Sequence, residues 1–474
     1  MSELWKLSAG EVADRVRTGD VSCVEVTDSV LDRIAERNPE LNAIVFDTSA
    51  EARARAVEAD AAVARGDELG PLHGVPVTIK ENIDQAGTPN PNGVAAFADL
   101  MATEDSPVVR NLRNAGAIIV GRTNTPEFSM RGTTDNPLRG RTVNPWDADT
   151  SPGGSSGGAG AAAASGMGAL HHGNDIGGSL RFPSFANGTV TVKPTTFRVP
   201  VYNGSASAER GPLSSAMSCQ GIIARHAADV ALATEVLIGP DPRDPNCPPV
   251  PWRGPALGDN IPVAVTTESA GFELHPGIRA LIERTAGYLA DAGYRVEEVD
   301  PPPVIEPAQA WFRAGSTELE VFLDPVVQDH GSDDVKKVFA HFFASSQVQD
   351  REGYMTEFAD RTRMMRDWNL FLDRYPLVIT PFMMTPMYRW DYDVQDHDAF
   401  QAFLDTSIYS FGINYLGLPA GVIGLDLVEG TPAAVQIVGR RYREDVICDA
   451  LAAVESANGG PLVHRLWERE TADT

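Results

Sequence analysis

Two serine–glycine runs could supply a nucleophile and a binding site for a negatively charged oxygen. The first run is SPGGSSGG at residues 151–158, and the second is DIGGSLR at residues 175–181. Glycine costs backbone entropy and serine competes with regular structure, so such runs are unfavourable unless backbone amides must approach another group closely. Serines framed by glycines therefore indicate acyl-transfer chemistry, in which a hydroxyl attacks and amides bind an oxyanion.

Lys80 is a candidate base for such a serine. A serine hydroxyl is a weak nucleophile until a base takes its proton. A lysine can serve only when burial lowers its pKa and leaves the amine neutral. Lys80 follows the apolar run of residues 75–79, in a chain that uses arginine for most of its basic residues. The same position also allows a structural lysine paired with Glu81 or Asp84.

Three other chemistries fit these residues less well. A phosphate-binding P-loop requires a lysine within the glycine run, and neither run contains one. Residues 153–157 match the G-x-S-x-G elbow, but loop-like residues precede them where that motif requires a strand, although His397 or His464 could complete such a triad. His171 and His172 are adjacent, so on a strand they point to opposite faces, and metal hydrolysis is not indicated.

Alternating strands and helices must position these groups. Strands are predicted at the run that ends in Lys80, from Ala117, and from Asn260. Apolar periodicity and helix caps predict helices at 8–37 (two helices), 49–66, 106–116, 225–238, 276–292 and 443–457. This order predicts an α/β fold with a mixed, mainly parallel, twisted central sheet covered by helices on both faces.

The chain is interpreted as one large domain spanning residues 1–474. Residues 1–66 form its N-terminal helical segment, and residues 67–240 form the core that contains the two runs. Residues 300–400 are rich in aromatic side chains and methionine. We expect this segment to be a helical insertion or cap that shapes the substrate pocket, with ordinary core packing as the alternative.

Charge and composition narrow the class of protein. The 474 residues include 39 basic and 65 acidic side chains, a formal charge of −26, which disfavours nucleic acid and anionic membranes as partners. The four cysteines are far apart and form no C-x-x-C pair, so neither a zinc site nor a disulfide framework is expected. No secretory signal or membrane span is recognisable, and the expected location is cytoplasmic.

Several motifs together carry a family resemblance. They are GVPVTIKENID around Lys80, GRTNTPEFS from Gly121, NPLRGRTVNPWD from Asn136, the two serine–glycine runs, KPT at Lys193 and GPLS from Gly211. In these motifs and their order, the chain resembles the amidase signature family from about Glu3 to Val454. The resemblance implies that family's fold, no metal and no cofactor.

The resemblance also implies roles for individual residues. Ser179 is expected to be the nucleophile, Lys80 the base, and Ser155, following a cis peptide bond, the bridge between them. The remaining expected site residues are the oxyanion-binding amides of Ile176, Gly177, Gly178 and Ser179, a substrate contact at Met130, and support from Ser156, Asp175 and Arg181.

The expected reaction is hydrolysis of an apolar or aryl amide to a carboxylate and ammonia or an amine. The alternative is an A-type glutaminase subunit of a tRNA-dependent amidotransferase; a catalytically silent binding protein is disfavoured by the intact triad. The expected partners are a small amide substrate and a second copy of the chain in a homodimer; the alternative function would require a partner subunit. Three departures from the family pattern concern the pocket: Asn174 in place of threonine, residues 187–189, and residues 433–434. Arg131 could select an anionic substituent or be salt-bridged.

Overall fold

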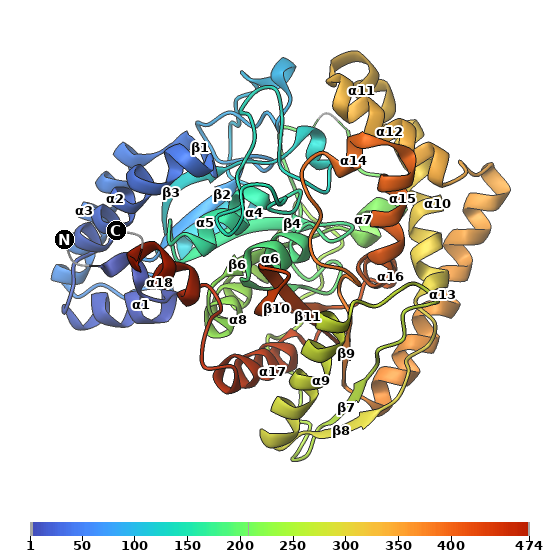
Figure 1. Cartoon of the computed structure of the whole chain (residues 1–474). Coiled ribbons are helices and arrows are strands. Elements are labelled where there is room, and N and C mark those ends of the chain that lie inside the picture. Colours follow the sequence, from blue (N-terminus) through green and yellow to red (C-terminus); the bar gives the residue numbers. More distant parts are fainter. Residues whose placement is uncertain (1–2, 207, 473–474) are drawn as a thin grey trace.

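A single eleven-stranded sheet forms the centre of the molecule, with strand order β1-β3-β2-β4-β6-β5-β10-β11-β9-β7-β8 (Figure 1). The computed structural model describes residues 3–206 and 208–472. The strands are β1 (Ile44–Asp47), β2 (Pro76–Lys80), β3 (Ile118–Thr123), β4 (Leu170–Asp175), β5 (Val190–Lys193), β6 (Cys219–Ala224), β7 (Pro262–Val265), β8 (Arg295–Glu298), β9 (Leu377–Thr380), β10 (Ala420–Val428) and β11 (Thr431–Gly439).

Helices cover both faces of this sheet, with α5 and α6 on one side and α8 and α17 on the other (Figure 1). The helices are α1 (Ala9–Thr18), α2 (Cys23–Leu41), α3 (Ser49–Arg65), α4 (Pro107–Asn114), α5 (Gly157–Ala164), α6 (Arg181–Asn187), α7 (Pro212–Met217), α8 (Ala227–Leu237), α9 (Pro276–Asp291), α10 (Ile305–Phe322), α11 (Asp324–His330), α12 (Asp333–Ser345), α13 (Arg351–Arg374), α14 (Tyr392–Gln395), α15 (His397–Thr406), α16 (Ile408–Leu416), α17 (Glu444–Ala457) and α18 (His464–Ala472). Short 3-10 helices occupy Leu4–Lys6, Ala95–Phe97 and Glu127–Ser129.

The predicted α/β class with a mixed sheet is confirmed, but the sheet is less parallel than expected. Strands β3, β2 and β4 are mutually parallel, and so are β9, β7 and β8. The strands between these two groups, from β4 through β6, β5, β10 and β11 to β9, are paired antiparallel, as are β1 and β3. Continuously buried strands show no alternation, so their apolar runs read alike in parallel and antiparallel sheets.

Local signals placed the early helices correctly. Ser8 with Glu11 and Ser22 with Glu25 both form complete capping boxes, at the starts of α1 and α2. In each box the serine oxygen accepts from the glutamate amide and the glutamate carboxylate accepts from the serine amide, so two unpaired helix amides are satisfied.

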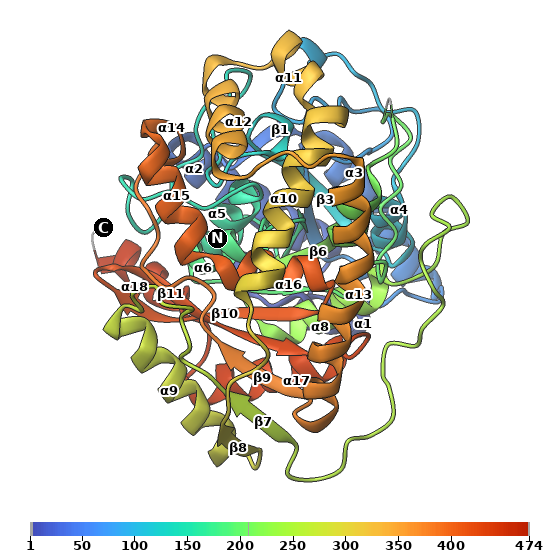
Figure 2. The same cartoon turned by 90° about the vertical axis from the view of Figure 1, so that its right-hand side faces the viewer.

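Residues 300–400 contain α10 to α14, together with β9, which lies inside the sheet between β11 and β7. Figure 2 shows α10, α12 and α13 along the face turned toward the viewer, with α16 between the longer helices and the sheet. This segment is therefore helical with one strand embedded in the core. In the described chain, no helix combines the length and apolar character needed to cross a membrane.

Four pieces of structure hold the expected site residues. β2 ends at Lys80 and is buried along its whole length. The first serine–glycine run leads into α5, all of whose residues are buried. β4 is also fully buried and ends at Asp175, and the second run connects it to α6.

Candidate active site

Lys80 is fully buried at the end of β2 and contacts three neutral oxygen atoms. Its Nζ lies 2.7 Å from Ser155 Oγ, 3.1 Å from Ser156 Oγ and 2.8 Å from Asn174 Oδ1. Burial lowers the pKa of Lys80 well below its ordinary value, because an ammonium ion loses its hydration there. A neutral amine in contact with a serine hydroxyl can accept a proton from it.

The two serine–glycine runs pack directly against each other. A Cβ atom on Gly153 would lie 2.7 Å from the carbonyl carbon of Phe182 in the first turn of α6. Asn187, at the end of α6, donates through Nδ2 to the Pro152 carbonyl oxygen at 2.8 Å. The peptide bond that precedes Ser155 is cis, as the resemblance implies. Only glycine fits at position 153, where the backbones of the two runs approach each other closely.

Asp175 fixes the shape of the second run. Its carboxylate accepts hydrogen bonds from the amides of Gly178 (2.8 Å) and Leu180 (3.1 Å), from Arg181 Nε (3.1 Å), and from Asn414 Nδ2 (2.9 Å). The Asp175 and Arg181 side chains are fully buried. The family resemblance implies that the Gly178 amide binds an oxyanion, whereas in the structure this amide donates to Asp175.

The neighbouring carbonyl oxygens of the loop are each held by a side chain, one from α10 and one from α16. Trp311 Nε1 donates to the Ile176 carbonyl oxygen at 2.7 Å, and Ser410 Oγ donates to the Gly177 carbonyl oxygen at 2.7 Å. The amides of Ile176, Gly177 and Ser179 have no acceptor among the residues that the structure describes. Three such amides in one short loop form an arrangement that can bind an oxyanion.

Ser179 lies between this loop and α6 and is only partly buried, unlike Lys80 and Ser155. Within the described parts of the chain, its hydroxyl has no hydrogen-bond partner. The structure thus brings Lys80 and Ser155 into direct contact and leaves the Ser179 hydroxyl accessible to a ligand.

The geometry agrees with what comparison with known proteins shows. The model of the amidase family matches residues 25–448. The chain belongs to the amidase signature family. As a member, it is an amidohydrolase, and the Lys80–Ser155 contact lies within the matched region.

Individual relatives span nearly the whole chain. It is 46% identical over 466 residues to an indoleacetamide hydrolase of Bradyrhizobium diazoefficiens, an alignment that covers 98% of this chain and 89% of that protein. It is 31% identical over 482 residues to the A-type subunit of the glutamyl-tRNA(Gln) amidotransferase of Moorella thermoacetica, covering 96% and 97%. A bacterial aryl acylamidase of the amidase signature family superposes with a TM-score of 0.82 at 27% identity, covering 96% of each chain.

Arg131 is salt-bridged rather than free to bind an anionic substituent. Its guanidinium donates to Asp393 from Nε at 3.0 Å and from Nη2 at 2.8 Å, and the arginine is almost completely buried. Asp334 and Asp391 lie at 3.7 and 3.6 Å. Three carboxylates around one guanidinium leave no net positive charge to attract an anion.

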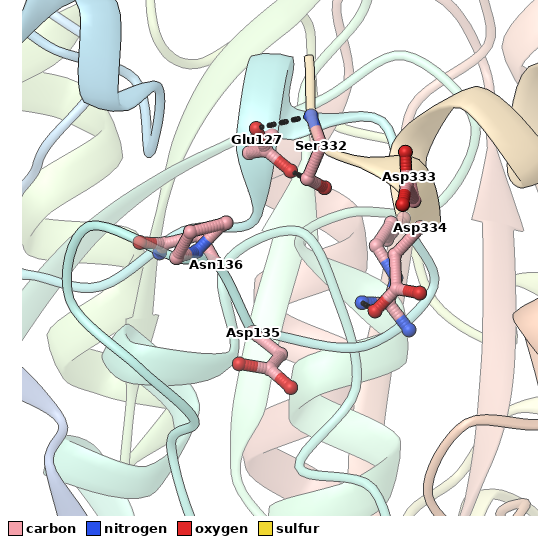
Figure 3. Close-up of a pocket in the computed structure, with 8 residues that line it drawn as sticks. Glu127, Asp135, Asn136, Ser332, Asp333 and Asp334 are labelled. Atoms are coloured by element: carbon pink, nitrogen blue, oxygen red, sulfur yellow. Dashed lines mark hydrogen bonds and ion pairs between the residues drawn. The ribbon is translucent and has the colours of Figure 1, made fainter.

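A cavity of about 370 Å³ beside Arg131 reinforces this conclusion. Figure 3 shows that Glu127 and Asp135 from one segment and Asp333 and Asp334 from the start of α12 face the same space. Glu127 accepts from the Ser332 amide at 3.0 Å and from its hydroxyl. The cavity is therefore acidic.

Aromatic rings lie against the loop that precedes Ser179. A Cβ atom on Gly177 would lie 2.8 Å from Trp311 Cζ2 and 3.1 Å from Phe411 Cε1, and the centroids of these two rings are 4.6 Å apart. Met130 instead packs with an apolar cluster that includes Phe339, and its expected contact with substrate stays a prediction.

Sequence reasoning missed two contributors to this site. Asn174 was noted only as a departure from the family pattern, yet it contacts Lys80 directly. Ser410, which orients the Gly177 carbonyl, gave no signal at all, because its place in α16 is set by packing and not by a local motif.

Proposed function

We propose that the protein hydrolyses a small aromatic amide through an acyl-enzyme on Ser179, releasing a carboxylate and ammonia or an amine. The observation that supports this proposal is the pair of rings, Trp311 and Phe411, packed against Gly177 in the loop that precedes Ser179. An aromatic wall at this place suits an aryl group close to the scissile carbonyl. The 46% identity to an indoleacetamide hydrolase supports the same substrate class.

The first half of the reaction forms the acyl-enzyme. Ser179 Oγ attacks the amide carbonyl carbon while its proton passes to Ser155 Oγ, and the Ser155 proton passes to the neutral amine of Lys80. The carbonyl oxygen becomes an oxyanion that the free amides of the loop bind. Lys80, now an ammonium ion, returns the proton through Ser155 to the leaving nitrogen as the C–N bond breaks.

The second half hydrolyses the ester. Water attacks the acyl carbon and gives a proton to Ser155, which passes its own to Lys80. The relay then returns a proton to Ser179 Oγ as the C–O bond breaks. Each half restores the neutral amine, so the cycle needs no other proton acceptor.

The second candidate is the glutaminase component of an amidotransferase, favoured by the 31% identity to the Moorella protein. Glutamine carries an ammonium and a carboxylate that need charged partners. Trp311 and Phe411 offer none, and the charge of Arg131 is compensated by Asp393. Aromatic amides are therefore the better match to these contacts.

A substrate panel tests the proposal. We expect the purified chain alone to release ammonia from indole-3-acetamide and phenylacetamide with a kcat/KM roughly 10- to 150-fold above that for acetamide, since burying an aryl ring contributes about 1.5–3 kcal/mol. Glutamine should be inert. A preference for glutamine, or activity only with added protein partners, would overturn the assignment. Mass spectrometry of enzyme trapped during turnover should find the acyl group on the peptide that contains Ser179. The Ser179→Ala substitution should abolish this adduct.

We further propose a cytoplasmic protein that forms a homodimer. The high negative charge supports the first part, because it favours solubility at neutral pH. Light scattering of the purified protein tests the second part: a monomeric mass at all concentrations would contradict it.

A further inference from the structure

Among the described residues, Asn174 is the one side-chain partner of the Lys80 amine that is not a serine. It comes from β4, which pairs with β2 in parallel, and its side chain is nearly buried. Its Oδ1 lies 2.8 Å from Lys80 Nζ, closer than Ser156 Oγ at 3.1 Å. The contact is therefore a full hydrogen bond and not incidental packing.

The direction of this hydrogen bond is set by a chain of amides. Asn174 Nδ2 donates to Asn82 Oδ1 at 3.0 Å, and Asn82 Nδ2 donates to Ser129 Oγ at 2.9 Å. The Ser129 hydroxyl donates in turn to Asn92 Oδ1 at 2.7 Å. With its amide nitrogen committed to Asn82, Asn174 presents only an acceptor to Lys80.

The hydrogens of Lys80 can then be counted. A neutral amine has two N–H donors and one lone pair. Asn174 Oδ1 must receive one N–H. The Ser156 hydroxyl donates to the main-chain carbonyl oxygen of Asn174 at 3.5 Å, so Ser156 Oγ accepts the second N–H of Lys80. The lone pair is left facing Ser155 Oγ, at 2.7 Å.

We propose that Asn174 is a positioning residue of the reaction, whose side-chain oxygen holds one N–H of Lys80 so that the amine lone pair faces the Ser155 hydroxyl. This inference rests on the proposed function, because it assumes that Lys80 receives the proton of Ser155. When Lys80 is protonated, its third N–H points to Ser155, and the same three contacts serve both states without movement.

The threonine that resembling sequences carry at this position would act less selectively. A threonine hydroxyl can donate as well as accept, so it leaves two arrangements of hydrogens around the amine. The asparagine carbonyl allows one. It also adds no charge, so Lys80 gains no counterion that would favour its ammonium form.

The charged groups around Lys80 fit a neutral amine. Asp175 favours the ammonium form, but its oxygens are occupied by Arg181 and by loop amides, and Arg210 opposes it. His172 has its pKa lowered by burial to about 3 and stays neutral, while Arg122 donates to the Lys80 carbonyl oxygen at 3.4 Å.

Glu81, the residue after Lys80, is paired with Arg139. A carboxylate at position 174 would therefore be the first anion in direct contact with the amine.

Three substitutions test the inference through the pH profile of kcat/KM. We expect kcat/KM of the wild-type enzyme to rise with pH as Lys80 loses its proton, and we call this rise the rising limb. In Asn174→Asp the new carboxylate should raise the Lys80 pKa and move the rising limb upward by about 1–3 pH units, the usual effect of an opposite charge at this distance. At pH values below the wild-type rise, activity should then be lost about 10- to 1000-fold, and it should be recovered at high pH. Asn174→Leu, which keeps the number of side-chain heavy atoms and removes both the acceptor and the Nδ2 donor, should lower kcat at every pH with little change in KM. Asn174→Thr should restore part of kcat.

Controls separate this inference from the proposed function. Asn111→Asp adds the same charge on α4, where Asn111 Nδ2 donates to the Leu237 carbonyl oxygen, and should leave the limb in place. If wild-type enzyme shows an acyl adduct on Ser179 and a rising limb, but neither Asn174→Asp nor Asn174→Leu changes the profile, the inference is wrong and the mechanism stands. If the wild-type enzyme shows neither adduct nor limb, the proposed function fails. Should Asn174→Asp not fold, Asn174→Thr and Asn174→Leu still decide: equal kcat in both would refute a need for the acceptor.

Discussion

Replacing Asp175 by asparagine should unlock the loop that carries Ser179. The change keeps the size of the side chain and removes its charge. Four groups donate to the carboxylate: the amides of Gly178 and Leu180, the guanidinium of Arg181 and the amide of Asn414. An asparagine has one acceptor oxygen, and its NH₂ group would face donors instead of acceptors.

The cost follows from burial. The Asp175 and Arg181 side chains are both fully buried, and removing one partner of such a pair costs about 3–5 kcal/mol. The unfolding entropy is about 2.1 cal/mol/K per residue, or about 1 kcal/mol/K for 474 residues. The expected fall in Tm is therefore about 3–5 °C. Because the loop amides lose their alignment, kcat should fall by at least about 100-fold.

Thermal unfolding and steady-state kinetics of the Asp175→Asn variant measure both effects. Asp241→Asn is the matched control, since the Asp241 side chain is equally buried and accepts from Arg110 at 2.6 Å and from Arg243 at 2.8 Å, outside this loop. It should lower Tm and leave kcat unchanged. An Asp175→Asn variant with wild-type Tm would refute the ion-pair reasoning, and one with wild-type kcat would show that Asp175 does not hold the loop.

Two further predictions concern the base and the loop. Because the proposed base is the neutral amine of Lys80, whose pKa burial lowers, kcat/KM should rise with pH through that lowered pKa and be level above it. His171 and His172, whose pKa values burial lowers to about 3, cannot supply this rise. A profile with no rising part at any pH at which the enzyme stays folded would exclude the role of Lys80. Gly178→Ala should abolish activity, because Gly178 has φ +132° and a Cβ there would collide with Ser410 Oγ and Phe182. The control is Gly287→Ala in α9, which should stay fully active because nothing lies within 4 Å of an added Cβ. An active Gly178→Ala enzyme would contradict the loop geometry.

Helix boundaries were predictable because their signals are local. Ser8 and Ser22 each lie three residues before a glutamate, and in the structure each serine–glutamate pair forms a capping box at the start of a helix. The direction of the central strands was not predictable. β11 is buried at all of its positions, so no alternation distinguishes antiparallel from parallel pairing. Which strands pair with β11 depends on how the chain connects the elements of the sheet, and the periodicity of apolar residues carries no information on those connections.

The sequence by itself determined the chemical groups of this protein: a lysine at the end of an apolar strand, and two serines framed by glycines whose spacing resembles the amidase signature family. Only the tertiary structure decided how these groups are held. Asn174 reaches Lys80 across 94 residues, Trp311 reaches the Ile176 carbonyl across 135, and Ser410 reaches the Gly177 carbonyl across 233. The physical reason is that a buried donor or acceptor must find a partner wherever packing places one, and packing joins residues without regard to their separation in the chain.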